Sequence, residues 1–230
     1  MTMMISPETY YEEYLKDKTT DEIIKKIRGL KKQIGHLKNV MEHPEYGSAP
    51  IIHPSEAVQL HWTREYLQRA VQALEDAGGT YTSSQADVRA TTFENNIPNI
   101  SKIIFSIGGY FSGNSEYTIC IGEQLTATLK EMWSDEMPHF LWNEDGELCS
   151  VQEFLEGIAN LHLGEWRSKY TPARFGYEIL DGTQWELEVQ YKNGQKPFKV
   201  YGDNIYPHNF SGFLSLLGID EQEDDENENY

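Results

Sequence analysis

Residues 181–201 read DGTQWELEVQYKNGQKPFKVY, and this stretch decides the fold class. Apolar and polar side chains alternate over 184–191, which is the period of a strand with one buried and one exposed face. A second strand is expected over 197–201, and Asn193-Gly194 between the two runs is typical of a tight hairpin turn. The stretch therefore predicts a pair of antiparallel strands.

The same alternation appears earlier in the chain. It predicts further strands at 101–111, 116–121, 125–132 and 176–180, which are separated by short polar turns. Short turns join neighbouring antiparallel strands, whereas parallel strands need long crossover connections. We therefore expect a mainly antiparallel sheet.

One or two helices are expected to cover this sheet. Ser150 and Glu153 form a capping box, and the apolar residues that follow them repeat at helical spacing. A last short helix is predicted at about 207–217, where Phe210 and Phe213 lie on one face.

The first third of the chain reads as helices. Ser6-Pro7 opens a short helix, Thr19 with Glu22 opens a longer one, and Ser55 caps a third. The apolar residues of the second helix follow a heptad stripe, namely Ile23, Ile27, Leu30, Ile34, Leu37 and Met41. A connection of some ten residues between the long helices predicts that they fold back on each other as an antiparallel hairpin.

The expected fold class is α+β, with an N-terminal antiparallel helical hairpin followed by a mainly antiparallel β-sheet domain with one or two covering helices. The predicted organisation has four parts. They are a helical hairpin domain at 1–79, a linker with a short helix at 80–99, the sheet domain at 100–218 and an acidic disordered tail at 219–230.

Charge is distributed unevenly along the chain, whose formal net charge is −18 at pH 7. Residues 81–230 hold 9 Lys and Arg against 25 Asp and Glu, whereas residues 1–80 hold 10 against 12. Binding of a phosphate backbone needs local positive charge, so direct nucleic-acid binding is not expected. A protein partner with a basic surface fits this charge better.

Composition and segment patterns indicate the compartment. The sequence lacks an apolar run of the roughly 20 residues that a membrane span needs, and its first residues do not resemble a signal peptide. Cys120 and Cys149 are too few for a disulfide framework, so we expect reduced thiols in a cytoplasmic protein without a membrane partner.

Motifs that would carry chemistry are missing. The glycine-rich stretch 108–113 lacks the lysine and the helix start that a phosphate-binding loop requires. His162 and Glu165 stand three residues apart, but no third metal ligand accompanies them in a recognisable motif. We therefore expect no catalytic, cofactor-binding or metal-binding residues, and a protein that is not an enzyme.

A partner-binding surface is the remaining kind of site. Glu186 and Glu188 alternate with apolar residues, so both are expected on the outer face of one strand, with Glu178 beside them on a neighbouring strand. The alternative is the ordinary polar face of a half-buried sheet. Aromatic residues near loop ends can anchor an interface or fill the core, and the candidates are Trp142, Trp166 and Tyr206.

Five segments of the chain stand out together: IRGLKKQIGHLKNVMEHP, TREYLQRA, FSIGGYFSG, DGTQWELEVQYKNG and YGDNIYPHNF. In these segments the chain resembles an uncharacterised family of small bacterial proteins that is loosely associated with mobile elements and phages. The resemblance covers most of the chain up to about Leu217 and leaves out the acidic tail. It implies a bacterial cytoplasm and a mobile-element setting, but no activity and no site residue.

The function predicted from the sequence is that of a non-catalytic acidic interaction protein. In its sharper form it is an inhibitor or adaptor that docks on a basic surface of a host or defence protein, with carboxylates that imitate the phosphates of a nucleic acid. Two alternatives remain: a hydrolase or nuclease of unfamiliar type that uses His162 and Glu165, and a structural module that forms a homodimer through the 20–43 helix.

Overall fold

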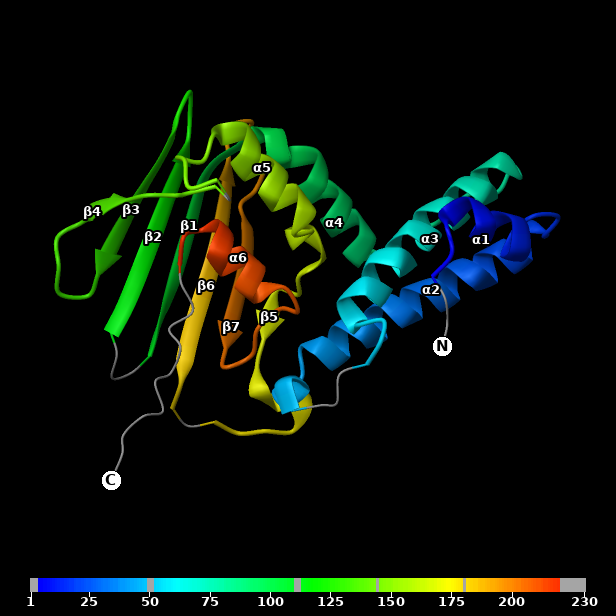
Figure 1. Cartoon of the computed structure of the whole chain (residues 1–230), viewed down its shortest axis with the longest axis horizontal. Helices are drawn as coiled ribbons and strands as arrows, with labels where there is room; N and C mark the ends of the chain where they lie inside the picture. The colour runs from blue at the N-terminus through cyan, green and yellow to red at the C-terminus, as the bar shows by residue number, and fades with distance from the viewer. Residues whose placement is uncertain (1–3, 49–51, 110–112, 144, 180, 220–230) are drawn as a thin grey trace. The chain divides into compact units, whose positions relative to one another are not determined.

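The computed structural model describes residues 4–48, 52–109, 113–143, 145–179 and 181–219. The chain divides into two compact units, Met1–Ser84 and Gln85–Tyr230. The described residues contain six α-helices and a seven-stranded mixed sheet, so the predicted α+β class is confirmed (Figure 1).

Three α-helices form the first unit: α1 (Pro7–Tyr14), α2 (Thr20–Met41) and α3 (Glu56–Asp76). Each begins at a capping residue that the sequence predicted. The hydroxyls of Ser6, Thr19 and Ser55 accept hydrogen bonds from backbone N–H groups of the first turn, which otherwise lack partners.

The apolar stripe of α2 is buried inside the first unit. Ile23, Ile27 and Leu30 form one cluster with residues near the end of α3, namely Ala70, Ala73 and Leu74. The N-terminal half of α2 thus lies against the C-terminal half of α3, which is compatible with the antiparallel hairpin predicted from the short connection. Because these side chains are buried within the chain itself, they are not available to join two chains in this conformation.

The second unit is built on the sheet, whose strand order is β4-β3-β2-β1-β6-β7-β5. The strands are β1 (Ile100–Gly109), β2 (Gly113–Ile121), β3 (Leu125–Glu131), β4 (Met137–His139), β5 (Lys169–Tyr170), β6 (Thr183–Tyr191) and β7 (Phe198–Asp203). The short β5 runs parallel to β7, and the other pairings are antiparallel. The mainly antiparallel sheet is therefore as predicted.

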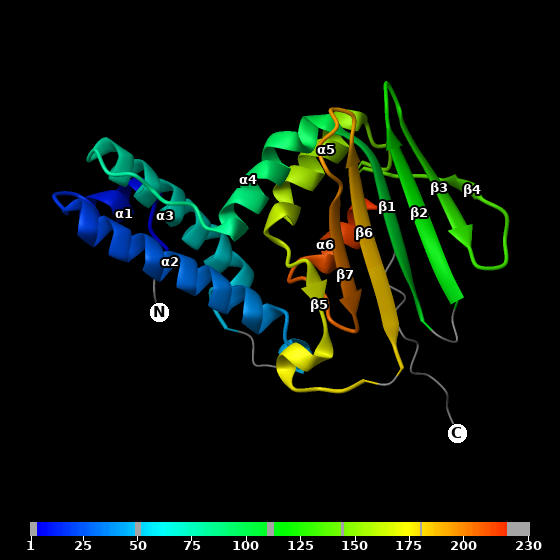
Figure 2. The same cartoon turned by 180° about the vertical axis from the view of Figure 1, so that it is seen from behind.

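Three helices pack on one face of the sheet: α4 (Gln85–Asn96), α5 (Val151–Asn160) and α6 (Phe210–Leu216). Figure 1 shows α5 and α6 in front of the strands, and Figure 2 shows the opposite face, which none of these three helices covers. Fully buried aromatic residues fill the space between the layers, with Phe105 and Trp185 from the strands and Phe154 and Phe213 from the helices. Short 3-10 helices complete the chain, namely η1 (Tyr46–Ser48), η2 (Ile97–Asn99), η3 (Leu163–Glu165) and η4 (Pro172–Phe175).

One predicted strand is wrong and two were missed. Residues 176–179 are not in a strand, because Gly176 takes a φ of 80° and ends η4. The strands β4 and β5 have only three and two residues, which is too short for an alternation to show in the sequence.

Segment boundaries also differ from those expected. Most of the stretch 80–99 that was expected to be a linker belongs to the second unit, since α4 contributes the buried Phe93 to its core. The acidic tail predicted at 219–230 lies outside the described residues except for Ile219.

Candidate functional site

Exposed apolar side chains are concentrated between residues 132 and 148. Six large apolar side chains in this short segment are exposed: Met132, Trp133, Met137, Phe140, Trp142 and Leu148. Trp133 is 91% exposed and Trp142 is 58% exposed, although both are among the side chains that proteins most often bury in part. These six residues are spread along β3, from Met132 beside Gly113 at one end to Phe140 and Leu148 beside Leu125 at the other, and we call them together the β4-edge surface.

The position of β4 explains why these side chains face outward. β4 is the outermost strand on one side of the sheet, and it pairs only with β3 among the described strands. Pro138, its middle residue, has no N–H group to offer to another strand. The edge therefore resists strand addition, and a partner would bind here mainly through side chains.

The loop that follows β4 is held in place by its own hydrogen bonds. Trp142 and Leu148 form an isolated bridge, and the Asn143 Oδ1 atom accepts hydrogen bonds from the backbone N–H groups of Asp145 and Glu147 at 3.2 and 2.9 Å. The Nδ2 of Asn143 also donates to Glu153 Oε1 on α5 at 3.1 Å. The bridge and these hydrogen bonds thus hold Trp142 and Leu148 at positions where their side chains are exposed.

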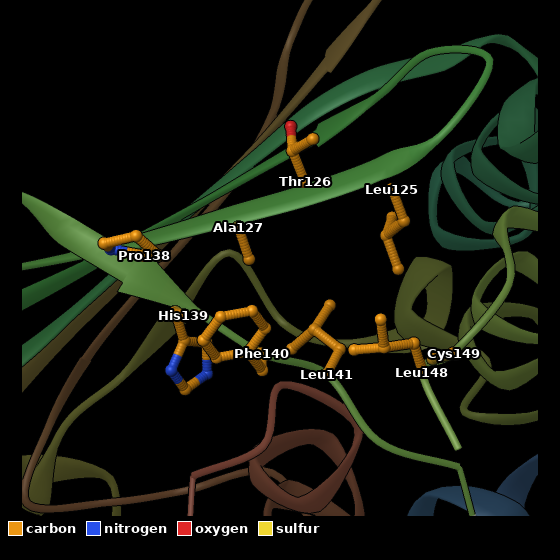
Figure 3. Close-up of a pocket in the computed structure, with 9 residues that line it drawn as sticks. All are labelled: Leu125, Thr126, Ala127, Pro138, His139, Phe140, Leu141, Leu148 and Cys149. Atoms are coloured by element: carbon orange, nitrogen blue, oxygen red, sulfur yellow. The ribbon is translucent and has the colours of Figure 1, made fainter.

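A small apolar pocket opens beside this surface (Figure 3). Its volume is about 240 Å³, and it lies between β3, β4 and the 140–149 loop. Most of its lining is apolar, as in Leu125, Leu141 and Leu148. Pockets that hold a drug-sized molecule usually measure roughly 300–1,000 Å³, so this one is better suited to a single apolar side chain of a partner.

Two lining residues carry polar groups that are already engaged or weakly reactive. His139 Nε2 lies 2.7 Å from the carbonyl oxygen of Leu217, and its ring contacts Tyr117 edge-on. Burial raises the pKa of the Cys149 thiol, and the charge of Glu153 raises it further. A thiol with a raised pKa is a poor nucleophile, so the pocket does not suit covalent catalysis.

The sequence around the β4-edge surface contains acidic residues but neither Lys nor Arg. Residues 131–166 contain nine Asp and Glu and no Lys or Arg. The carboxylates in this run are Glu131, Asp135, Glu136, Glu144, Asp145, Glu147, Glu153, Glu156 and Glu165. Hydrogen bonds from Ser150 lower the pKa of Glu153, which keeps it ionised at neutral pH. In the sequence, the exposed apolar residues are thus interspersed with carboxylates, and no Lys or Arg stands among them.

The acidic patch predicted on the sheet lies on a charge-balanced face instead. Glu186 is exposed and Glu188 half-buried on the face away from the helices, as the alternation predicted. The strand register places four lysines and four acids of the strands on that face. The lysines are Lys102, Lys130, Lys169 and Lys199, and the acids are Glu116, Glu186, Glu188 and Asp203. Glu188 forms an ion pair with Lys199, and hydrogen bonds from Lys199 and Gln190 lower its pKa.

The other predicted partner-binding residues are dispersed. Glu178 is exposed but outside any strand, so it does not join Glu186 as expected. Trp166 is only 1% exposed and belongs to the core, which rules out contact with a partner in this conformation. Tyr206 is half-buried against Trp185 and Phe210. Of the predicted residues, only Trp142 lies on the β4-edge surface.

One feature of the sequence indicates the β4-edge surface, although the sequence-based predictions did not include it. A run of 36 residues, 131–166, has no Lys or Arg, although Lys and Arg make up 19 of the 230 residues of the chain. Such a run next to several Trp, Met and Phe residues indicates an acidic surface with apolar anchors. The exposure of those anchors required the structure, because the same residue types also fill cores.

The residues proposed for an alternative enzyme do not assemble a site. His162 Nδ1 lies 3.8 Å from Glu94 Oε1, at the end of α5, and both side chains are partly exposed. Within the described ranges, no group of three or more His, Cys, Asp or Glu side chains is arranged to hold a metal ion. In the same ranges, none of the helices combines the length and apolar character that crossing a bilayer requires.

Comparison with known proteins gives no relative. Neither a protein-family model, nor a curated protein, nor a solved structure matches this chain.

Proposed function

We propose that this protein is a non-catalytic interaction protein that docks a basic partner protein on the β4-edge surface. The single observation that carries the proposal is the concentration of six exposed apolar side chains next to a run of nine carboxylates without Lys or Arg. Exposed apolar patches with a polar rim are typical of protein interaction sites.

Each part of the surface has a distinct physical role in this proposal. Trp133 and Trp142 supply large, mostly exposed apolar areas, and Trp is the residue most often found at the energetic centre of an interface. The 240 Å³ pocket receives one apolar side chain of the partner. The carboxylates attract a basic surface from a distance and accelerate association, an effect that salt screens.

The proposal narrows the function that the sequence suggested. An inhibitor or adaptor that occupies a basic surface of a host or defence protein, in a bacterial cytoplasm and a mobile-element setting, fits the net charge of −18. The charge-balanced sheet face gives no support to an acidic patch at Glu186 and Glu188, so the docking role is assigned to the β4 edge. In this proposal the N-terminal helical hairpin is a separate module, and its net charge is near zero.

A defined peptide tests the proposal without knowledge of the partner. A fluorescent amphipathic helix of leucine and lysine is titrated with the full chain and followed by anisotropy, and a leucine–glutamate helix serves as the charge control. We expect binding of the lysine peptide that weakens as salt rises, and no binding of the glutamate peptide.

Matched variants locate the binding. The double substitution Trp133→Ser and Trp142→Ser, and separately Asp135→Asn with Glu147→Gln, should each weaken binding at least tenfold. The control is Glu116→Gln with Glu186→Gln on the sheet face, which should leave the affinity unchanged. Equal affinity for all four proteins, or equal loss in the control, would show that the β4-edge surface is not the docking site.

A further inference from the structure

A second pocket of the sheet unit has basic residues and no acidic residue in its lining. It has a volume of about 450 Å³ and lies between α4, Ser168 and the turn that joins β6 to β7. Three basic residues line it, namely Arg89, Lys196 and Lys199, and none of the lining residues is Asp or Glu. The Lys199 side chain itself pairs with Glu188 on the other face of the sheet. The chain from residue 81 onward holds 25 acidic and only 9 basic side chains, so this lining is the reverse of the unit's composition.

Arg89 lies in the pocket wall, where none of the described carboxylates forms an ion pair with it. Its Nη1 donates to the carbonyl oxygen of Trp166, its Nη2 lies 3.4 Å from the carbonyl oxygen of Lys199, and its guanidinium centre lies 4.3 Å from the centroid of the Phe198 ring. Burial lowers the pKa of Arg89, because it removes water from the charged guanidinium.

A guanidinium has five N–H donors, and these two hydrogen bonds leave others for a ligand. An anion in the pocket would supply the missing counter-charge, in the bidentate geometry that a guanidinium offers to phosphate and carboxylate groups.

Three residues that line the pocket carry hydroxyl groups, which can act as neutral donors. They are Thr92, Ser168 and Tyr191. Burial raises the pKa of Tyr191 to about 12, so its phenol keeps its proton at neutral pH and can donate a hydrogen bond. Lys196 is exposed at the rim, whereas Lys199 is already paired with Glu188. The cationic contribution to a ligand therefore comes mainly from Arg89 and Lys196.

The rest of the lining is apolar and aromatic. Phe93 and Phe198 pack against each other with ring centroids 4.7 Å apart, and both line the pocket. The volume of about 450 Å³ falls within the roughly 300–1,000 Å³ range of small-molecule sites.

We infer that this pocket binds a small organic anion, in which a phosphate or carboxylate group lies at Arg89 and Lys196 and an apolar body lies against Phe93 and Phe198. The inference is independent of the proposed docking function, because the two involve different residues at different strands of the sheet.

Phenyl phosphate and benzoate are the probes, because each joins an anion to a flat apolar body. Binding to the full chain is followed by chemical-shift changes in two-dimensional NMR at constant ionic strength. Inorganic phosphate, which has the charge without an aromatic ring, and benzyl alcohol, which has the ring without a charge, serve as controls. We expect saturable shifts around Arg89 and Tyr191 with at least one of the two probes, and weaker binding of both controls.

Substitutions on the turn separate a specific pocket from general attraction. Lys196→Gln should weaken binding of the probe about tenfold, and Tyr191→Phe should weaken it severalfold. Lys192→Gln is the matched control, since Lys192 is exposed on the same turn but does not line the pocket. Arg89 also anchors backbone carbonyls of the fold, so Lys196→Gln carries the test. The inference is overturned if neither probe shifts the pocket residues, or if Lys192→Gln and Lys196→Gln weaken binding equally.

Discussion

The indole nitrogen of Trp166 donates a hydrogen bond of 2.9 Å to Oδ1 of Asn209. The Nδ2 of the same asparagine donates to the carbonyl oxygen of Leu161, at the end of α5, over 2.6 Å. One amide thus satisfies both the polar atom of a buried tryptophan and a carbonyl at a helix end, where backbone acceptors lack helical partners. It also explains why Trp166, expected to bind a partner, belongs to the core.

Replacement of this amide should destabilise the sheet unit. In Asn209→Ala the Trp166 N–H and the Leu161 carbonyl both lose their partner, and each buried polar group left unpaired costs about 1–3 kcal/mol. We expect the free energy of unfolding to fall by about 2–4 kcal/mol in urea denaturation followed by tryptophan fluorescence.

Asn95→Ala is the control for this prediction. Asn95 is exposed on α4, so its replacement should change the free energy of unfolding by only about 0.5 kcal/mol. A similar loss in both variants would contradict the role assigned to Asn209.

Gly202 lies directly beneath the ring of Trp185. A Cβ atom built at this position would lie 2.0 Å from Nε1 and Cε2 of the indole, far inside van der Waals contact. The Trp185 ring cannot move away easily, because its Nε1 donates to the carbonyl oxygen of Ile205 at 3.1 Å and its side chain is buried. The strand therefore needs a residue without a side chain at this point.

Gly202→Ala should consequently be costly. The added methyl group forces a shift of β7 or of the Trp185 ring, and overpacking of this kind costs about 1–3 kcal/mol or more. Thermal unfolding of Gly202→Ala and Gly122→Ala measures the difference. Gly122 is the control, since a Cβ there would lie 3.8 Å from its nearest neighbour, which is an ordinary contact. Equal melting temperatures would show that Trp185 does not pack on Gly202 in this way.

The sequence predicted most of the regular structure but not its edges. Long elements that have a clear apolar periodicity or an N-cap residue were predicted correctly. Examples are α2 with its Thr19 capping box and β6 with its strict apolar–polar alternation. β4 and β5 were missed because they are formed by pairing with a neighbour that the local sequence does not reveal. The false strand at 176–179 shows the same limit, since an apolar alternation there is interrupted by a glycine with positive φ.

The candidate site was predicted less well than the fold, for a physical reason. The outward direction of Glu186 and Glu188 follows from the period of a strand, but their neighbours follow from the register. The register places Lys199 opposite Glu188, and this pairing removes the expected acidic patch. Likewise, composition alone does not separate the buried Trp166 from the exposed Trp133, because burial depends on tertiary contacts.

Exposure of the tryptophans can be tested by quenching. Trp133 and Trp142 are 91% and 58% exposed, whereas Trp166 and Trp185 are each 1% exposed. We expect acrylamide to quench a large part of the fluorescence of the native protein. The double substitution Trp133→Phe and Trp142→Phe should remove the largest part of that accessible fraction, leave a smaller part from the half-buried Trp62, and shift the remaining emission to shorter wavelength. Unchanged quenching in the double variant would contradict the exposure of the β4-edge surface.

The capping box at the start of α5 should make stability depend on pH through Glu153. The backbone N–H of Ser150 donates to Glu153 Oε2 at 2.8 Å, and the backbone N–H of Glu153 donates to Ser150 Oγ at 3.2 Å. Hydrogen bonds from Ser150, and then from Asn143, lower the pKa of Glu153 below the ordinary value of 4.5. The folded state therefore binds this proton less tightly than the unfolded state.

The direction of the pH effect follows from this lowered pKa. The stabilisation by the Glu153 carboxylate is fully present above its unfolded pKa of about 4.5 and is lost as the pH falls through the lower folded pKa. Glu153→Gln removes the charge, so the native protein should be more stable than this variant at neutral pH. We expect the difference in urea midpoint to stay constant down to about pH 5 and to shrink below it. A difference that is independent of pH down to about pH 3, or that grows as the pH falls, would contradict the ionised capping box, and Asn143→Ala should reduce the same difference without abolishing it.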